Sequence, residues 1–159
     1  MPTATRHSPR NADAWLQLDN QLCFALYSTS LAMTKLYKPL LEPLGLTYPQ
    51  YLALLVLWER DALTVSELGE RLFLDSGTLT PLLKRMEAAG WLQRERAADD
   101  ERRVIVSLTA AGSALRQQAR AVPVQLAAAT GCSAKELAEL TQQLQDLRER
   151  MREAHAVDD

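Results

Sequence analysis

The sequence predicts a mainly α-helical fold with one small β-hairpin, and two observations favour this fold class. Apolar residues recur at three- and four-residue steps over most of the chain, which is the period of an α-helix. Between residues 91 and 108 the pattern changes to alternation, which is typical of paired strands. With 159 residues, 47% of them hydrophobic, the chain is long enough to form one compact domain or one subunit of a small oligomer.

The first predicted element is a long amphipathic helix from Ala14 to about Leu41. A polar segment, residues 1–13, precedes it and is expected to be a flexible tail. Prolines near the end of the helix and Gly45 are expected to bend or end it. Cys23 then falls near the middle of this helix, which raises the question of what a thiol does there.

Further helix starts are marked by capping residues. A serine or threonine followed three residues later by glutamine or glutamate forms a capping box. This spacing occurs at Thr47 and Gln50, Thr64 and Glu67, and Ser133 and Glu136. Another helix is expected to start near Asp75 or Ser76 and to end at Gly90. Thr109 is expected to cap a helix that Pro123 kinks, and the chain closes on a helix with leucines at a/d-like spacing.

The order of helix, helix and hairpin between residues 64 and 108 predicts a winged helix-turn-helix. The hairpin consists of strands 91–96 and 103–108 joined by a charged turn, and in such a fold the second helix enters the DNA major groove. The predicted organisation is a DNA-binding region at 47–108, bracketed by the helical regions 14–45 and 109–152. These terminal regions are expected to pack together or, as N- and C-terminal dimerisation helices, across a dimer interface.

The second helix and the wing carry residue types that contact DNA. Hydroxyl side chains can reach phosphates or base edges, and arginine and lysine supply positive charge. The candidates are Ser76, Thr78, Thr80, Lys84 and Arg85 on the helix, and Arg94, Arg96, Arg102 and Arg103 on the wing. Acidic residues in the wing turn partly cancel this charge, although Asp100 is well spaced to orient Arg102. The net charge of −2 means that any DNA contact comes from a local patch, and a solvated hairpin without a ligand stays the alternative.

Composition also bears on other classes of function. No run approaches the roughly 18 apolar residues of a membrane span, and the N-terminal segment is polar, so we expect a cytoplasmic protein without membrane contact. His7 and His155 lie in polar tails without metal-ligand spacing, so we expect neither a metal site nor a cofactor. Two cysteines in a reducing compartment are not expected to form a permanent disulfide, although a transient redox bridge stays open.

The stretch "DSGTLTPLLKRMEAAGWLQRERAADDERRVIVSLT" resembles the winged-helix core of the MarR family, whose wing carries an Asp-x-Arg signature, here residues 100–102. The stretch "LCFALYSTSLAMTKLYKPLLEPLGLTYPQYLALLVLWE" resembles the organic hydroperoxide resistance regulators (OhrR) within that family. The resemblance spans about Leu16 to Met151. It implies a homodimer with intertwined terminal helices and two lobes that read a pseudo-palindromic operator in double-stranded DNA. It further implies that the wing arginine, Arg102, enters the minor groove.

The predicted role of the two cysteines depends on whether this resemblance is taken into account. From the residues alone, Cys23 and Cys132 are small hydrophobes. The resemblance, which is to the two-cysteine type of regulator, implies instead that Cys23 is the redox-sensing thiol and that Cys132 of the other subunit bridges to it. It also implies that Tyr37 and Tyr48 of the opposing subunit donate hydrogen bonds to the sulfur. Apolar neighbours disfavour a thiolate, and two phenolic donors would offset this. The same apolar surroundings would favour organic hydroperoxides over hydrogen peroxide.

The function implied is a transcriptional repressor that binds operator DNA when reduced. An organic hydroperoxide would act as inducer by oxidising Cys23, which releases the DNA. Two alternatives stay open from the sequence. One is a MarR-type repressor released by a small aromatic ligand, and the other is a thiol peroxidase that turns over with Cys23 and Cys132.

Overall fold

The computed structural model describes residues 9–156. The chain divides into two compact units, with the boundary between Leu36 and Tyr37. The first unit contains two 3₁₀ helices, η1 (Pro9–Leu16) and η2 (Leu18–Asn20), followed by most of helix α1 (Leu22–Leu41). The second unit contains the end of α1 and all later elements.

The predicted start of the first helix at Ala14 is wrong, because α1 begins only at Leu22. The Asn20 side chain donates to the Ala14 carbonyl at 2.8 Å, and the Gln21 side chain donates to the Trp15 carbonyl. These bonds satisfy carbonyl groups that a continuous α-helix would use, so the segment folds into 3₁₀ turns instead.

The corrected start also moves two predicted features. Cys23 is the second residue of α1 and does not lie in the middle of a helix. Of the predicted flexible tail, residues 1–8 lie outside the described residues, and from Pro9 onward the backbone belongs to η1.

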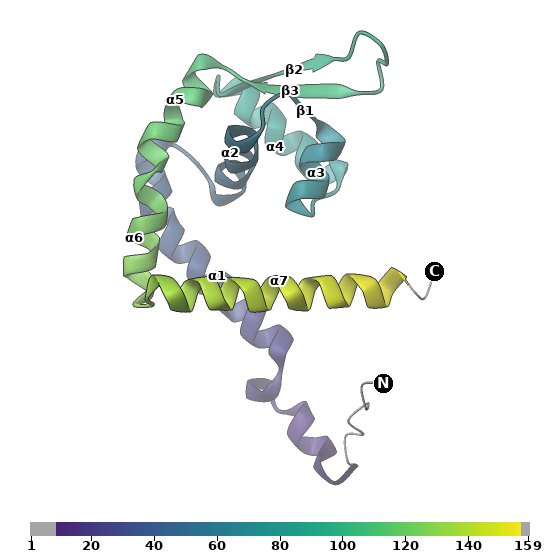
Figure 1. Cartoon of the computed structure of the whole chain (residues 1–159), viewed down its shortest axis with the longest axis vertical. Coiled ribbons are helices and arrows are strands. Elements are labelled where there is room, and N and C mark those ends of the chain that lie inside the picture. Colours follow the sequence, from purple (N-terminus) through teal and green to yellow (C-terminus); the bar gives the residue numbers. More distant parts are fainter. Residues whose placement is uncertain (1–8, 157–159) are drawn as a thin grey trace. The chain divides into compact units, whose positions relative to one another are not determined.

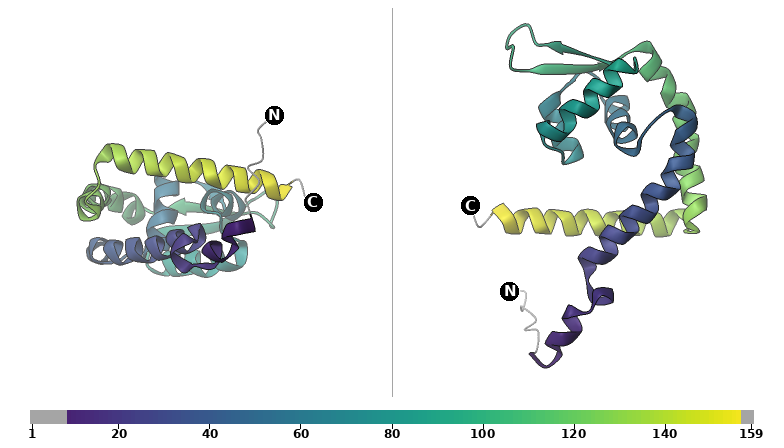
Figure 2. Two further views of the ribbon diagram at one scale, coloured as in Figure 1. Left: turned by 90° about the horizontal axis from the view of Figure 1, so that it is seen from below. Right: turned by 180° about the vertical axis from the view of Figure 1, so that it is seen from behind.

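The second unit contains the predicted winged helix-turn-helix (Figure 1). Its elements are 3₁₀ helix η3 (Glu42–Leu44), α2 (Tyr48–Glu59), β1 (Leu63–Thr64), α3 (Val65–Leu72), α4 (Ser76–Ala88), β2 (Leu92–Arg96) and β3 (Val104–Leu108). The strands form an antiparallel sheet in the order β1-β3-β2, so β3 is central. The β2–β3 hairpin extends beyond the helices, as the view from behind in Figure 2 shows.

The helix starts form at the predicted caps because each cap satisfies backbone N–H groups that lack an intrahelical acceptor. Both bonds of the capping box are present at Thr47 and at Thr64. The Asp75 carboxylate accepts from the Thr78 N–H at 2.7 Å and starts α4 at Ser76. Gly90 follows α4 with φ of 83°, a left-handed conformation that glycine adopts without strain.

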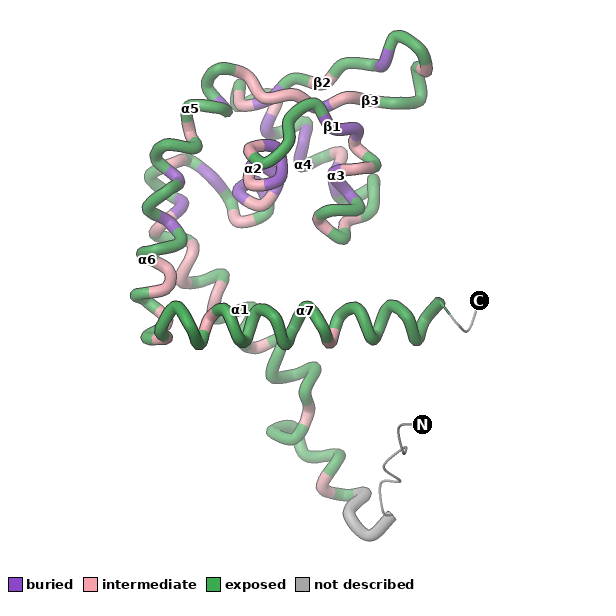
Figure 3. Tube along the Cα trace, in the orientation of Figure 1, coloured by how far each residue is buried: buried purple, intermediate pink, exposed green. Residues whose placement is uncertain are grey.

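The hydrophobic core lies between α2, α3, α4 and the sheet (Figure 3). The largest fully buried side chains are Leu41, Leu54, Leu57, Leu68, Leu79, Leu83, Met86, Leu92, Val106 and Val122. In α4, buried residues recur at three- and four-residue steps, so one face packs on the core and the opposite face is left for solvent.

Three helices follow the wing: α5 (Ala110–Ala119), α6 (Ala121–Thr130) and α7 (Ala134–Ala156). The kink predicted at Pro123 is instead a break at Arg120, between α5 and α6. Proline has no N–H to donate to the carbonyl four residues earlier, that of Ala119, so the helix is interrupted before Pro123. Helix α7 carries no buried residue.

The base of the wing joins α5 through a close backbone approach at Gly112. A Cβ placed on Gly112 would lie 1.9 Å from the Trp91 carbonyl oxygen. The Gly112 carbonyl accepts from the Trp58 indole N–H at 3.0 Å, and the Thr109 hydroxyl donates to the Gly90 carbonyl at 2.6 Å. These contacts fix α2, the end of α4 and the start of α5 to one another.

Within residues 9–156 no single helix is both long enough and apolar enough to cross a membrane. The segments Leu22–Leu44 and Tyr48–Glu59 reach that length and composition only as a pair, with a 69° bend between them.

Candidate nucleic-acid interface and cysteine sites

Helix α4 presents a polar face to solvent. Leu79, Leu82, Leu83 and Met86 are buried on one side. The predicted DNA contacts Ser76, Thr78, Lys84 and Arg85 are all exposed, and Thr80 is half-buried. The hydrophobic spacing that packs α4 therefore also sets which side chains can reach a ligand.

The first turn of α4 is fixed by Asp75. The hydrogen bonds that its carboxylate accepts from the Thr78 N–H and hydroxyl lower the pKa of Asp75. The carboxylate therefore stays charged at neutral pH and holds the backbone around the exposed Ser76 and Thr78.

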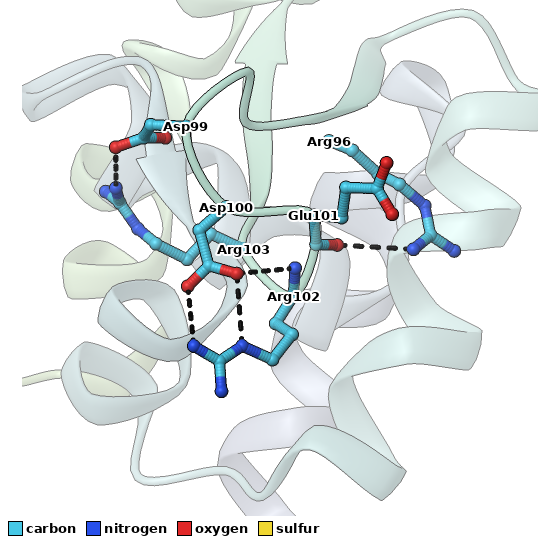
Figure 4. A network of polar contacts seen from close by, with 6 residues as sticks. All are labelled: Arg96, Asp99, Asp100, Glu101, Arg102 and Arg103. Atoms are coloured by element: carbon cyan, nitrogen blue, oxygen red, sulfur yellow. Dashed lines mark hydrogen bonds and ion pairs between the residues drawn. The ribbon is translucent and has the colours of Figure 1, made fainter.

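The wing turn holds Arg102 in one orientation (Figure 4). The Arg102 backbone N–H and Nε donate to Asp100 Oδ1 at 3.0 and 3.1 Å, and Nη2 donates to Oδ2 at 3.2 Å. The Arg102 side chain is nevertheless 90% exposed. Hydrogen bonding to Arg102, from the side chain first and then the backbone, lowers the pKa of Asp100. The spacing of these residues thus produces a pre-oriented, accessible guanidinium.

The other wing arginines also have protein partners. Arg103 pairs with Asp99 at 3.2 Å, and Arg96 donates to the Glu101 carbonyl at 3.2 Å (Figure 4). Arg94 is more enclosed: its Nη2 donates to Glu87 Oε2 at 2.8 Å, and 23% of its side chain is exposed. Because Glu87 lies on α4, the Arg94 guanidinium ties β2 to α4.

A depression of about 330 Å³ lies between α4, the start of α3 and the wing. Its lining brings together predicted residues from both elements, namely Ser76, Thr80, Arg94, Arg102 and Arg103. Lys84 and Arg85 are not part of this lining. Ser66, near the start of α3, is an exposed hydroxyl on the same surface that sequence reasoning missed. Its place two residues after the Thr64 cap was the signal that could have found it.

Replacing Arg102 with alanine is expected to weaken binding to a specific DNA site by about 1 to 3 kcal/mol, the range for one good contact. Arg150→Ala, which removes an exposed arginine from α7, is the matched control and should leave affinity unchanged. Fluorescence anisotropy with a labelled duplex measures both. Equal losses in the two variants would remove Arg102 from the interface.

Cys23 is an exposed, free thiol in the first unit. As the second residue of α1 it lies among N–H groups that have no intrahelical acceptor, and this end of a helix favours a negative charge. Its apolar neighbours Leu22, Phe24 and Leu26 are also exposed in the single chain. The dry surroundings expected for Cys23 are therefore not provided by the described residues of one chain.

Tyr37 and Tyr48 are brought together in the second unit. Their ring centroids lie 4.6 Å apart with an interplanar angle of 36°. Burial, with smaller contributions from Tyr48 and Tyr51, raises the pKa of Tyr37 to about 12. Burial also raises the pKa of Tyr48. Both phenols are therefore O–H donors at neutral pH, while their contact with Cys23 stays a prediction.

Cys132 is a half-buried, free thiol in the turn between α6 and α7. Gly131, with φ of 72°, ends α6, and the Cys132 N–H donates to the Thr130 hydroxyl at 3.3 Å. The next residue, Ser133, caps α7 through the predicted capping box with Glu136. Among residues 9–156 there is no group of three or more histidine, cysteine, aspartate or glutamate residues that could hold a metal ion.

Comparisons with known proteins agree with the winged helix-turn-helix described above. Residues 35–118 match the family described as transcriptional regulator SarA/Rot. The organic hydroperoxide resistance transcriptional regulator of Bacillus subtilis (strain 168) is 52% identical over 134 residues, which is 84% of this chain and 91% of that protein.

Solved structures of the protein AbfR are also similar to this chain, and one of them is AbfR of Staphylococcus epidermidis. Reduced AbfR bound to DNA is 37% identical, with a TM-score of 0.70, over 87% of this chain and 97% of that one. Disulfide-formed AbfR is 41% identical, with a TM-score of 0.59, over 85% and 95% respectively.

The fold, with its exposed recognition helix and wing, is that of a winged-helix transcriptional regulator. The chain belongs to the SarA/Rot family of transcriptional regulators. Its 52% identity over most of both chains also makes it a relative of the organic hydroperoxide resistance regulator of Bacillus subtilis. These relatives are regulators and not enzymes, which removes support from the thiol-peroxidase alternative.

Proposed function

We propose that this chain is a redox-sensing repressor that binds operator DNA when reduced and releases it when an organic hydroperoxide oxidises Cys23. The observation that carries the proposal is the position of Cys23, an exposed free thiol at the amino end of α1. A thiol there is accessible to a peroxide.

The proposed chemistry has two steps. The Cys23 thiolate attacks the hydroperoxide, the O–O bond breaks, and the alkoxide leaves as an alcohol after taking a proton, which gives a sulfenic acid. The thiolate of Cys132 of the partner subunit then attacks the Cys23 sulfur, the S–O bond breaks, hydroxide leaves and takes a proton to become water, and a disulfide forms between subunits.

A homodimer is supported by the apolar surface that the single chain leaves uncovered. In the first unit the exposed apolar side chains are Trp15, Leu16, Leu18, Leu22, Phe24, Leu26, Tyr27 and Leu31, and on α7 they are Leu140, Leu144 and Met151. Contiguous exposed apolar surface marks a protein interface in a soluble protein. A partner subunit over these residues would also supply the dry surroundings that favour organic over inorganic peroxides.

The DNA-binding part of the proposal rests on α4 and the wing. Helix α4 would enter the major groove with Ser76, Thr78, Lys84 and Arg85, while Arg102 would enter the minor groove. In a two-fold dimer the two α4 helices would lie about one DNA turn apart, near 34 to 36 Å. The similarity to reduced AbfR bound to DNA supports this arrangement.

The redox part is supported by the states in which AbfR has been solved. Its structures include a reduced and an overoxidised form, both bound to DNA, and a form with a disulfide. These forms are properties of AbfR. They make oxidation of a thiol, rather than binding of an aromatic ligand, the better proposal for this chain.

The test uses a duplex selected from random-sequence DNA by the reduced full-length protein. Cumene hydroperoxide is expected to abolish the gel shift, and dithiothreitol is expected to restore it. Release at equal rates with hydrogen peroxide would contradict the selectivity, and a shift that persists in excess cumene hydroperoxide would contradict the proposed function.

Cys132→Ser is expected to leave oxidation of Cys23 intact but to stop it at the sulfenic acid or at a mixed disulfide with a small thiol. Non-reducing gels of the oxidised wild type should show a covalent dimer, and those of the variant should show only monomer. A covalent dimer of Cys132→Ser would contradict the assignment of Cys132 as the second sulfur.

A further inference from the structure

The redox site that we propose uses two tyrosines, but the structure holds a third tyrosine against them. Tyr51 lies on α2, three residues after Tyr48, so the two project from the same side of the helix. Its ring centroid is 5.8 Å from that of Tyr37, with an interplanar angle of 45°. Such tilted pairs at this separation attract each other beyond the burial of their area.

Tyr51 is far more enclosed than its two neighbours. It is 3% exposed, whereas Tyr37 and Tyr48 are half-buried. On another side its ring helps to line a depression of about 210 Å³ together with Trp58 and Pro123. Because Tyr51 is buried and its ring packs on that of Tyr37, it has little freedom to change rotamer.

The hydroxyl groups of the three tyrosines are all unengaged within the described part of the chain. None of them has a hydrogen-bond partner among residues 9–156. A phenol that donates to nothing in its own chain is available to an acceptor brought by another molecule or subunit. Of the three tyrosines, Tyr37 and Tyr48 are the more accessible to such an acceptor.

We propose that Tyr51 is a positioning residue of the redox site, whose ring supports the Tyr37 ring so that the Tyr37 hydroxyl is aimed at the Cys23 thiolate of the partner subunit. This inference rests on the proposed function and adds to it a residue that does not touch the sulfur. The support comes from the ring, because Tyr51 is 3% exposed and its ring packs against that of Tyr37.

The three hydroxyls also influence one another's ionisation. Burial first, and then Tyr48, raises the pKa of Tyr51, and Tyr51 in turn contributes to the raised pKa of Tyr37. Removing the Tyr51 ring would uncover Tyr37 and remove a like charge, so the Tyr37 pKa should fall from about 12 toward its ordinary value. This shift reports on the cluster without any reaction at Cys23.

The experiment compares Tyr51→Leu with Tyr51→Phe in a Cys132→Ser background, where Cys23 is the one remaining thiol of the sequence. The rate of thiol loss with cumene hydroperoxide is followed with a thiol reagent. Tyr51→Leu is expected to react roughly tenfold more slowly, because a misaligned hydrogen bond to an anion loses most of its contribution. Tyr51→Phe keeps the ring and should stay within about twofold of the parent, since only the hydroxyl is lost.

Leu57→Ala is the matched control for stability. Leu57 is a fully buried residue of the same helix that takes no part in the tyrosine cluster, so its loss should lower the unfolding temperature without slowing thiol oxidation. Phenol ionisation is followed by ultraviolet absorption at alkaline pH in every variant. Tyr51→Leu should show the larger downward shift of the Tyr37 pKa, because Tyr51→Phe removes only the smaller charge contribution and keeps the ring that helps to bury Tyr37.

Each outcome decides the proposal. Unchanged oxidation in Tyr51→Leu would overturn it, as would Tyr51→Phe reacting as slowly as Tyr51→Leu or Leu57→Ala slowing to the same extent. If Cys23 of the parent does not react with hydroperoxide at all, the proposed function fails as well. A reacting parent with an unaffected Tyr51→Leu variant would overturn only the role of Tyr51.

Discussion

Cys23→Ser is expected to bind the selected DNA as the wild type does and to show no release at any concentration of cumene hydroperoxide. Serine preserves the size of the side chain, so the fold and α4 are expected to be unchanged. Serine cannot form a sulfenic acid, so the peroxide no longer has a thiol at position 23 to oxidise. The effect is a complete loss of response. It is measured by titrating peroxide against the gel shift.

Cys132→Ser is the control for this result, because it removes the other thiol and keeps Cys23. Oxidation of Cys23 should still be detectable there by mass as one added oxygen or one mixed disulfide. If Cys23→Ser were released by peroxide as readily as the wild type, the sensor would lie elsewhere in the chain and the proposed function would be wrong.

Gly112→Ala is expected to give the largest loss of stability among single-methyl changes in this chain. The added Cβ would lie 1.9 Å from the Trp91 carbonyl oxygen and 2.9 Å from its carbon, which are backbone atoms that cannot rotate away. Overpacking against fixed atoms costs about 3 kcal/mol or more. Urea denaturation followed by circular dichroism should show this as a lower midpoint.

Gly77→Ala is the matched control. Gly77 also lies in a helix, and its Cβ would meet only the Asp75 side chain, at 3.2 Å. Alanine is favoured over glycine inside a helix by about 1 kcal/mol, so this variant should be no less stable than wild type. A midpoint for Gly112→Ala that matches Gly77→Ala would mean that the approach of α5 to Trp91 is not tight.

Most of the fold could be predicted because its signals are local. The capping boxes at Thr47, Thr64 and Ser133 place helix starts within a few residues, and alternation places β2 and β3. Strand β1 was missed because two residues carry no period, and its pairing of Leu63 with Val106 is long-range. Such pairings depend on the packed core rather than on neighbouring residues.

The errors have the same origin. The start of α1 depends on the Asn20 and Gln21 side chains bonding to carbonyls six residues back, and the break at Arg120 depends on a proline three residues ahead. Both are side-chain effects that compete with a correct helical period.

In the candidate site, too, contacts between neighbouring residues could be predicted from the sequence, whereas contacts between different elements could not. The contact of Asp100 with Arg102 follows from a spacing of two residues and could be predicted. The pairing of Arg94 with Glu87 joins two elements and could not be predicted from the sequence. The sequence alone therefore suggested that the Arg94 charge was available for DNA. The roles of Cys23, Tyr37 and Tyr48 came from the family resemblance, since a thiol and two phenols in apolar helices otherwise indicate only core packing.

The paired charges of the wing have a consequence for how such a regulator finds its site. Arg102 and Arg103 each have a carboxylate within about 3 Å, so from beyond a Debye length of about 8 Å the wing exerts little net field. The wing itself should then contribute little to electrostatic steering toward DNA or to retention on arbitrary sequences. Attraction that does not depend on sequence falls instead to exposed charges outside the wing, such as Lys84 and Arg85 of α4.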